Sequence, residues 1–363
     1  MFRIPRLYRW AVPTGALVIT GGVMAGSLIS VAQAAPALPS RTPAQLLAEV
    51  AQDQGPAFTG TVVETASLGL PSLPGNNDPT SITSLLTGSH TVRVWYASPQ
   101  HYRLALPGSL SETDVVRDGG TAWLWQSTAD SVAEITIPAR SAPAPAAVPA
   151  LTPQQAAQQL LAAVGPTTTV SVDSNVLVAG QAAYELVLAP KDSRSLIGQV
   201  RIAVDGSNGV PLRVQVFTRG AQTPAISVGF TAITFTAPAP AETTFTPPPG
   251  ATITKLNPDQ AGQGPQGQAP AVSTVGSGWL TVLELPSAAL TSGTPAAPPS
   301  DNPSSDDSGA ALQALLASAK AVQGSWGSGH LLRTSLFSVL ITDTGRAFVG
   351  AVQPSVLYAA AAS

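Results

Sequence analysis

The feature that most restricts the fold of this 363-residue chain is a series of short segments, from Phe58 to Phe245, in which apolar and polar residues alternate. One such segment places Val92, Val94 and Tyr96 on one face and Thr91, Arg93 and Trp95 on the other. A period of two is that of a β-strand, because successive side chains point to opposite faces of a sheet. Turn sequences such as Asp118-Gly119-Gly120 separate the segments, so together they predict an antiparallel meander.

A few segments have helical spacing instead. Thr42–Gln54 and Thr152–Val164 each begin with Thr-Pro, which suits an N-cap followed by the first helical position, and each continues with apolar residues at helical spacing. Near the C-terminus, the pattern from Leu312 to Val322 predicts a helix, and Pro354–Ala362 predicts another after a hairpin around residues 343–345. The chain is therefore predicted to be mainly β (α+β), with a small C-terminal α+β appendage.

The N-terminus has the pattern of an export signal. Arg3, Arg6 and Arg9 precede an uncharged stretch over residues 11–32, and Ala32-Gln33-Ala34 fits the small-x-small site of a signal peptidase. We expect cleavage after Ala34; the alternative is an uncleaved segment that anchors the chain in the membrane. In both cases the rest of the chain is predicted to be exported and extracytoplasmic, periplasmic or in the cell envelope.

Composition shifts divide the chain into parts. We predict a signal peptide over 1–34, a large β domain over 35–256, a linker over 257–274 and a small C-terminal domain over 275–363. Within the last, residues 291–309 are rich in Pro, Ser and Asp and are predicted to be a disordered loop.

Several functional classes are disfavoured. The net charge of −3, with only 10% charged residues, gives no basic surface for nucleic acid. The chain has no cysteine, and its three histidines are not spaced as metal ligands, so we expect neither a metal site nor a cofactor. Gly324–Gly329 contains Gly-Ser-Trp-Gly-Ser-Gly, but a hairpin strand follows it instead of the helix that a nucleophile elbow needs. No catalytic residue is predicted, and the chain is interpreted as a non-enzyme.

The order of these elements resembles the superfamily of periplasmic lipoprotein carriers (LolA/LppX-like) and the N-terminal domain of the regulator RseB. The resemblance covers about residues 43–255 and depends on strand-and-turn sequences. These are DGGTAWLW (118–125), YELVLAPK (184–191), VDG to GVPLRV (204–214) and FTPPPGA (245–251).

The resemblance implies a highly curved antiparallel sheet that forms an incomplete barrel, with helices plugging its concave side. It implies an apolar cavity that takes up acyl chains of a lipid or lipoprotein. The alternative is an RseB-like regulator that binds an anti-sigma factor or another envelope membrane protein, which the extra C-terminal domain favours.

Strand aromatics are the candidates for the lining of such a cavity. They are Trp95, Tyr102, Trp123, Trp125, Phe217, Phe230 and Phe235. The alternative for each is ordinary core packing, where most strand aromatics are found. Arg93 and Arg103 are candidates for contact with a lipid head group, the alternative being exposed strand arginines.

Overall fold

The computed structural model describes residues 38–51, 55–69, 87–108, 110–137, 165–256, 272–287 and 319–363. Within these ranges the chain forms two β-sheets, one of thirteen strands and one of six. The large sheet takes its strands from residues up to Leu256, and the small sheet takes its strands from Ser273 onward. The prediction of a mainly β fold with a small C-terminal α+β part is confirmed.

The large sheet contains most of the strands that alternation predicts. Its strands are β1 (Phe58–Ser67), β2 (Thr87–Ser98), β3 (His101–Pro107), β4 (Glu112–Asp118), β5 (Thr121–Gln126), β6 (Ser131–Thr136), β7 (Thr168–Val172), β8 (Val176–Val178), β9 (Gln181–Pro190), β10 (Ile197–Asp205), β11 (Pro211–Thr218), β12 (Ile226–Thr234) and β13 (Thr252–Leu256).

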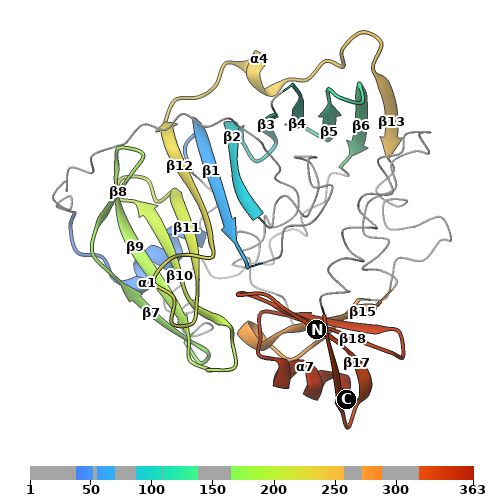
Figure 1. Ribbon diagram of the computed structural model, residues 1–363. Helices are drawn as coiled ribbons and strands as arrows, with labels where there is room; N and C mark the ends of the chain where they lie inside the picture. The colour runs from blue at the N-terminus through green and yellow to red at the C-terminus, as the bar shows by residue number, and fades with distance from the viewer. Residues whose placement is uncertain are drawn as a thin grey trace, which may run out of the picture.

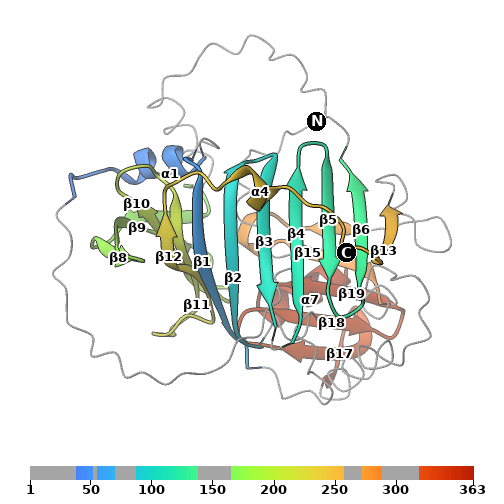
Figure 2. The same ribbon diagram turned by 90° about the horizontal axis from the view of Figure 1, so that it is seen from above.

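The strand order in this sheet is β13-β6-β5-β4-β3-β2-β1-β12-β11-β10-β9-β7, with β8 paired to β9. Its two end strands do not pair with each other, so the sheet is strongly curved but open, as Figures 1 and 2 show. Register shifts occur between Thr61 and Val62 and between Ala203 and Val204. Such β-bulges bend a strand and increase its twist, which favours this curvature.

One pair of strands departs from the predicted antiparallel pattern. β13 is parallel to β6, while the neighbouring pairs from β6 to β7 are antiparallel. After β12 the chain crosses the sheet through the short helix α4 (Pro240–Thr243) before it enters β13 at the far edge (Figure 2). A crossover of this kind brings the chain back in the same direction, so the sheet is mixed.

The first predicted helix is present as α1 (Pro43–Ala51). Thr42 caps it, because the Thr42 hydroxyl accepts a hydrogen bond from the Gln45 backbone N–H (3.3 Å) while the Gln45 side chain accepts one from the Thr42 backbone N–H (2.8 Å). Leu46 and Leu47 are buried in a cluster with Tyr184 and Leu186 of β9. Helix α1 therefore covers one face of the sheet over β7, β9 and β10.

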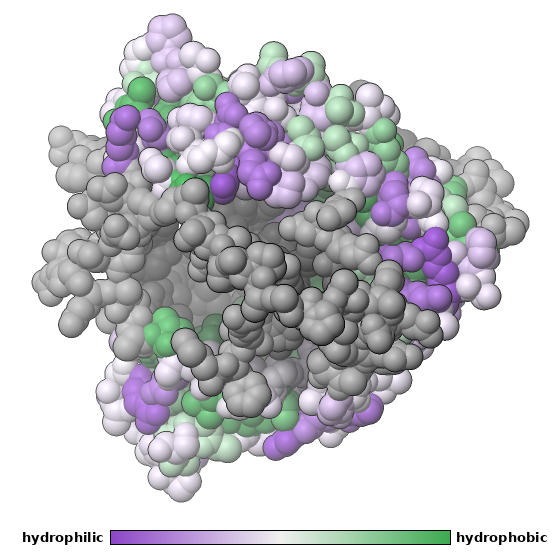
Figure 3. Space-filling model, turned by 180° about the vertical axis from the view of Figure 1, so that it is seen from behind, coloured by the Kyte–Doolittle hydropathy of each residue, from purple (hydrophilic) through white to green (hydrophobic). Residues whose placement is uncertain are grey.

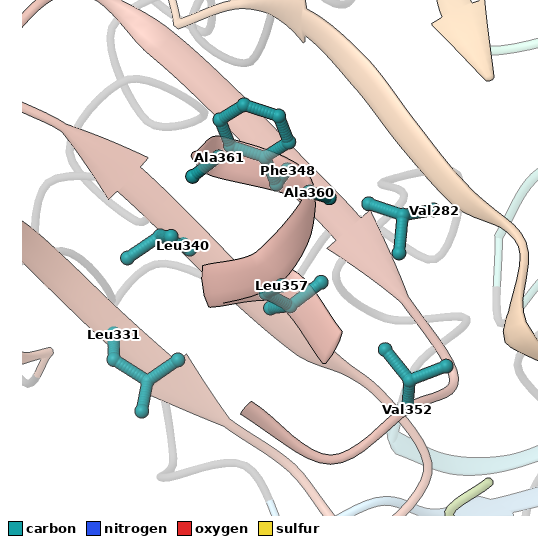
Figure 4. Close-up of a cluster of buried hydrophobic side chains, with 8 residues drawn as sticks. All are labelled: Val282, Leu331, Leu340, Phe348, Val352, Leu357, Ala360 and Ala361. Atoms are coloured by element: carbon teal, nitrogen blue, oxygen red, sulfur yellow. The ribbon is translucent and has the colours of Figure 1, made fainter. Parts of the chain in front are cut away.

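The small sheet has the order β14-β15-β19-β18-β17-β16. Its strands are β14 (Ser273–Val275), β15 (Val282–Pro286), β16 (Lys320–Gly324), β17 (Gly327–Arg333), β18 (Ser338–Thr342) and β19 (Arg346–Gly350). The closing helix is α7 (Pro354–Ala361), as predicted, and it lies across one face of this sheet. Leu357, Ala360 and Ala361 of α7 pack against Leu340 and Phe348 in a buried core (Figure 4).

The two sheets are in contact. Leu336, in the loop between β17 and β18, is buried against Leu68 and Ala225, and the Ser335 backbone N–H donates to the Leu68 carbonyl (3.0 Å). A backbone bridge joins Ser195 and Val352. Because main-chain hydrogen bonds as well as apolar packing link them, the small sheet has a defined position below the large one (Figure 1).

One helix prediction is wrong, and three other predictions concern residues that the structure does not describe. Val322, predicted at the end of a helix, lies in strand β16 and pairs with Gly329, so the helical pattern was wrong at its C-terminal end. The signal peptide, the predicted helix 152–164 and the loop 291–309 lie outside the described residues. Among the described helices, none has the length and apolar character needed to cross a bilayer.

Candidate ligand-binding face

The strand register assigns each side chain of the large sheet to one of two faces, because residues directly opposite each other on paired strands share a face. One face carries His90, Glu64, Val228, Ile202 and Leu186, which follow one another across the sheet. Leu186 packs against α1, and this is also the face that the small sheet contacts, through Ile226. We call it the inner face, and the opposite one the outer face.

On the inner face, an apolar row crosses five strands. Each residue lies opposite the next, one from each of β2 to β6: Val94, Leu104, Val115, Leu124 and Ala133. With strands about 4.8 Å apart, the row is about 19 Å long. These side chains are half-buried, and Leu124 is 36% exposed. Seen from behind, described residues form an upper and a lower part of the surface, each with apolar and polar side chains (Figure 3).

On β2 and β3, an aromatic residue lies two positions from the member of the apolar row, Tyr96 beside Val94 and Tyr102 beside Leu104. Phe58 stacks on Tyr96 (ring centroids 5.1 Å apart) and meets Phe230 edge-on (5.5 Å). Tyr96 lies opposite Tyr102, and Tyr102 lies opposite Arg117. On the inner face, the aliphatic Leu104 is thus followed along β3 by the aromatic Tyr102. Across the sheet, Tyr102 lies opposite the cationic Arg117 of β4.

A polar pair lies on the other side of the apolar row. His90 is buried, and its Nδ1 is 2.9 Å from an Oε of Glu64 on the neighbouring strand. Burial raises the pKa of Glu64, while the contact with His90 opposes that shift. The two side chains satisfy each other at the end of the inner face where the small sheet makes contact.

The outer face of the same strands is partly covered by the chain between β12 and β13. Within α4, Glu242 accepts hydrogen bonds from the Trp95 indole N–H (3.1 Å) and from the Ala239 backbone N–H (2.7 Å). Just beyond α4, Phe245 packs against the Trp123 ring (5.8 Å between centroids). Residues 239–251 therefore act as a strap over β2 to β5.

Beneath this strap lies an ion pair with one buried partner. Asp114 is fully buried and bonds to Arg103, whose guanidinium also lies 5.4 Å from the Trp95 ring. Burial raises the pKa of the Asp114 carboxyl to about 6, against the opposing attraction of Arg103. The other Asp114 oxygen and the Trp125 indole N–H are buried without a protein hydrogen-bond partner among the described residues. The Asp114 carboxyl and the Trp125 indole N–H are thus enclosed instead of open to a ligand.

The structure places the seven predicted aromatics on different surfaces. Trp95, Trp123 and Trp125 lie on the outer face, with Trp125 directly opposite Asp114. Tyr102 and Phe230 lie on the inner face. The two others have these surroundings: Phe217 is buried beneath the Arg201 guanidinium, and Phe235 packs in a cluster with Phe230. Whether any of the seven contacts a ligand stays a prediction.

The predicted head-group arginines lie on the outer face. Arg93 is exposed there, opposite Thr61, and Arg103 is held in its ion pair with Asp114. The aliphatic residues of the apolar row, by contrast, were not among the sequence candidates. The signal that finds them is the two-residue alternation itself, combined with the strand pairing, since each is an ordinary strand residue taken alone.

The described residues contain no group of three or more His, Asp or Glu side chains placed to hold a metal ion. His101 lies 3.3 Å from Asp118 at the start of β3, and His90 pairs with Glu64. Gly324 and Gly327 pair across the turn between β16 and β17, so the Gly-Ser-Trp-Gly sequence is a hairpin turn as interpreted.

No family model and no curated protein sequence matches the chain. Solved structures do resemble it. A chain from the MucA/MucB complex of Pseudomonas aeruginosa is 15% identical, with a TM-score of 0.46, and the match covers 88% of this chain and 97% of that one. LprF from Mycobacterium bovis is 12% identical (TM-score 0.27), over 59% of this chain and 100% of its own. A LolA superfamily protein from Nitrosomonas europaea is 11% identical, with a TM-score of 0.23, and the match covers 57% of this chain and 99% of that one. One of these matches, the LolA superfamily protein, carries the superfamily name that the sequence resemblance gives.

Proposed function

We propose that the protein is an exported, non-enzymatic binding protein that holds acyl chains of a lipid or lipoprotein against the inner face of its large sheet. The observation that carries this proposal is the apolar row across β2 to β6. Its side chains stay half-buried or exposed, whereas on the outer face of the same strands Ala105, Asp114 and Val116 are buried beneath the strap. A soluble protein gains nothing from an apolar row left open, so the row is best explained by an apolar ligand.

The energetics suit such a ligand. Burial of an acyl chain stabilises the complex by about 0.8 kcal/mol for each CH₂ removed from water. The row is about 19 Å long, so an extended chain laid across the strands would contact several aliphatic side chains in turn. The aromatic side chains beside it, which include Tyr102 and Phe230, would widen the apolar contact. These two residues are the members of the predicted set that we retain for the inner face.

We further propose that this binding takes place outside the cytoplasm. The basic start of the chain and the Ala-Gln-Ala sequence support export with cleavage after Ala34, or anchoring in the membrane if the signal is retained. The division at 1–34, 35–256, 257–274 and 275–363 belongs to the same proposal. Mass spectrometry of the extracytoplasmic protein is expected to find a mature N-terminus at Ala35.

The test of lipid binding is to purify the protein under native conditions and to identify co-purifying lipids by mass spectrometry. Leu124→Asp would place a carboxylate in the apolar row, where its desolvation by a bound chain is unfavourable, and bound lipid should be lost. Ile253→Asp is the matched control, because Ile253 is 48% exposed and lies on the outer side of edge strand β13. A protein that carries no lipid and takes up none would contradict the proposal.

A second candidate is a regulator that binds an anti-sigma factor or another envelope membrane protein. It is favoured by the small sheet, which contacts the inner face through Leu336 and through a hydrogen bond from the Trp279 indole to the Thr168 hydroxyl (2.7 Å). A pure carrier does not require this second unit. Crosslinking in cells, followed by identification of the attached partner, distinguishes the two: an envelope protein without lipid would favour the regulator.

A further inference from the structure

The inner face of the large sheet carries few charges among the described residues. Across the paired strands, register places Glu64, His90 and Arg117 there, while Arg93, Arg103, Asp114, Glu134, Glu185, Arg201 and Arg213 lie on the outer face. Glu64 and His90 form a pair with each other. Arg117 is therefore the cation of this face, and no described carboxylate lies within ion-pair distance of it.

Arg117 has a fixed position at the end of β4. Its Nε–H donates to the Gly119 carbonyl in the following turn (2.9 Å), which holds the side chain near the strand. A guanidinium has five N–H donors, and this bond uses one of them. Arg117 lies opposite Tyr102 on one side and Ala122 on the other, so an aromatic ring and a methyl group flank it.

The distance from Arg117 to the apolar row is short. Val115 of the row is two residues away on the same strand and the same face, which corresponds to about 7 Å. On the opposite side of the row, β4 and β5 carry the neutral residues Thr113 and Gln126. At β4, the apolar row thus has the cation Arg117 on one side and the neutral Thr113 on the other, and the Glu64–His90 pair lies further away, on β1 and β2.

We propose that the ligand of the inner face is an anionic amphiphile, with its carboxylate or phosphate at Arg117 and its acyl chain leading from Val115 along one half of the apolar row. This inference rests on the proposed function and deepens it by naming the class of head group. The planar guanidinium fork matches the geometry of a carboxylate or phosphate, and such charge-assisted hydrogen bonds are among the strong ones. A neutral head group would leave the cation without this partner.

The experiment compares probes that share one chain and differ in the head group. The chain recovered from the cell envelope is delipidated and titrated with oleate and oleyl alcohol, and separately with oleoyl lysophosphatidic acid and monoolein. We expect at least one anionic probe to bind about tenfold more tightly than its neutral counterpart, as one charge-assisted hydrogen bond provides. The pair that shows this preference tells whether a carboxylate or a phosphate is the preferred head group.

Three variants assign the preference to Arg117. Arg117→Gln should lower affinity for the anionic probe about tenfold and leave the neutral probe unchanged, while Arg117→Lys should retain most of the preference. Arg93→Gln, on the outer face, is the matched control and should change neither. Circular dichroism establishes that each variant is folded.

The outcomes separate the two proposals. If anionic and neutral probes bind equally, or if Arg117→Gln weakens both to the same extent, the head-group inference is wrong while the acyl-binding proposal stands. If none of the four probes binds the delipidated protein, both are wrong, and the inner face is then covered by the chain itself.

Discussion

The two faces of strands β3 to β5 are built from the same short segments, yet they differ in how completely they are covered. On the outer face, Val116 is 0% exposed and Ala105 is 2% exposed, beneath the strap that Glu242 and Phe245 hold in place. On the inner face, Leu124 and its neighbours in the apolar row stay half-buried or exposed. Both faces of these strands carry apolar side chains, so apolar content alone does not tell which face binds a ligand. The informative difference is how much of each side chain the rest of the protein covers.

The inner face itself shows the same contrast between its two halves. Over β9 and β10, Leu186 and Tyr184 are closed off by Leu46 and Leu47 of α1. Over β2 to β6, the residues of the apolar row have no such described helix against them. Core packing extends into part of this second half, where Val94 and Leu104 pack beside the buried Val92 and Leu106. The more open part, which we propose for the ligand, is centred on Leu124 of β5.

The largest expected effect comes from placing a charge on each face. Val116→Asp should destabilise the fold by more than about 4 kcal/mol, because an unpaired carboxylate is unfavourable at a fully buried site. Leu124→Asp should cost less than about 1 kcal/mol, because its site is partly open to solvent. Urea unfolding measures both, and equal losses would remove the proposed difference between the faces.

A smaller loss is expected for Trp123→Ala. Removing this half-buried ring from beneath the strap should lower the free energy of unfolding by about 2 to 3 kcal/mol, since its contact with Phe245 is lost. We expect lipid uptake per folded molecule to be unchanged. A selective loss of uptake would instead place the ligand on the outer face, where the sequence-based prediction for Trp123 and Trp125 would then hold.

Burial of Asp114 on the outer face also predicts that the stability of the fold depends on pH. The folded-state pKa of Asp114, about 6, is above its ordinary value, so the folded protein binds more protons than the unfolded chain between about pH 4 and 6. The free energy of unfolding should therefore fall as pH rises through this window, by on the order of 3 kcal/mol. Asp114→Asn should flatten this slope.

Glu64→Gln is the control for that measurement, because burial also raises the pKa of Glu64, on the inner face. Its effect on the slope should be smaller, since Glu64 is only partly buried. Denaturant unfolding at several pH values gives both slopes. A larger change for Glu64→Gln would show that the inner face is the more enclosed of the two.

The smallest expected effect concerns the strap. Glu242→Ala removes the acceptor of the Trp95 indole N–H and of the Ala239 backbone N–H, which should cost about 1 kcal/mol. Thr244→Ala, in which an exposed hydroxyl bonded at 3.3 Å is removed, is the nearby control and should cost less. Thermal unfolding measures both variants, and Glu242→Ala should lower the melting temperature more than Thr244→Ala if Glu242 holds the strap.

The sequence predicts the strands well, and it predicts the faces only in part. Alternation correctly puts Val92, Val94 and Tyr96 on one face and Trp95 on the other, because a side-chain period of two is a local property. Which of these faces is inner depends on where α1, the strap and the small sheet pack. Those are long-range contacts, and no local pattern specifies them.

The candidate site shows the same limit. Aromatic content selects Trp123 and Tyr102 alike, although register places them on opposite faces. The parallel edge strand β13 also escaped prediction, because a crossover of the chain, and no residue of the strand itself, sets its direction. The helical pattern at Val322 failed because pairing with β17 outweighs local spacing.

The most direct test of the account is to map where an acyl chain touches the protein. A fatty acid that carries a photoreactive diazirine in its chain is bound and irradiated, and the attached peptides are identified by mass spectrometry. We predict attachment within the apolar row, at Val94, Leu104, Val115 or Leu124, and its loss in Leu124→Asp. Attachment at Trp123 or Trp125 beneath the strap, or no attachment to the large sheet, would contradict the account.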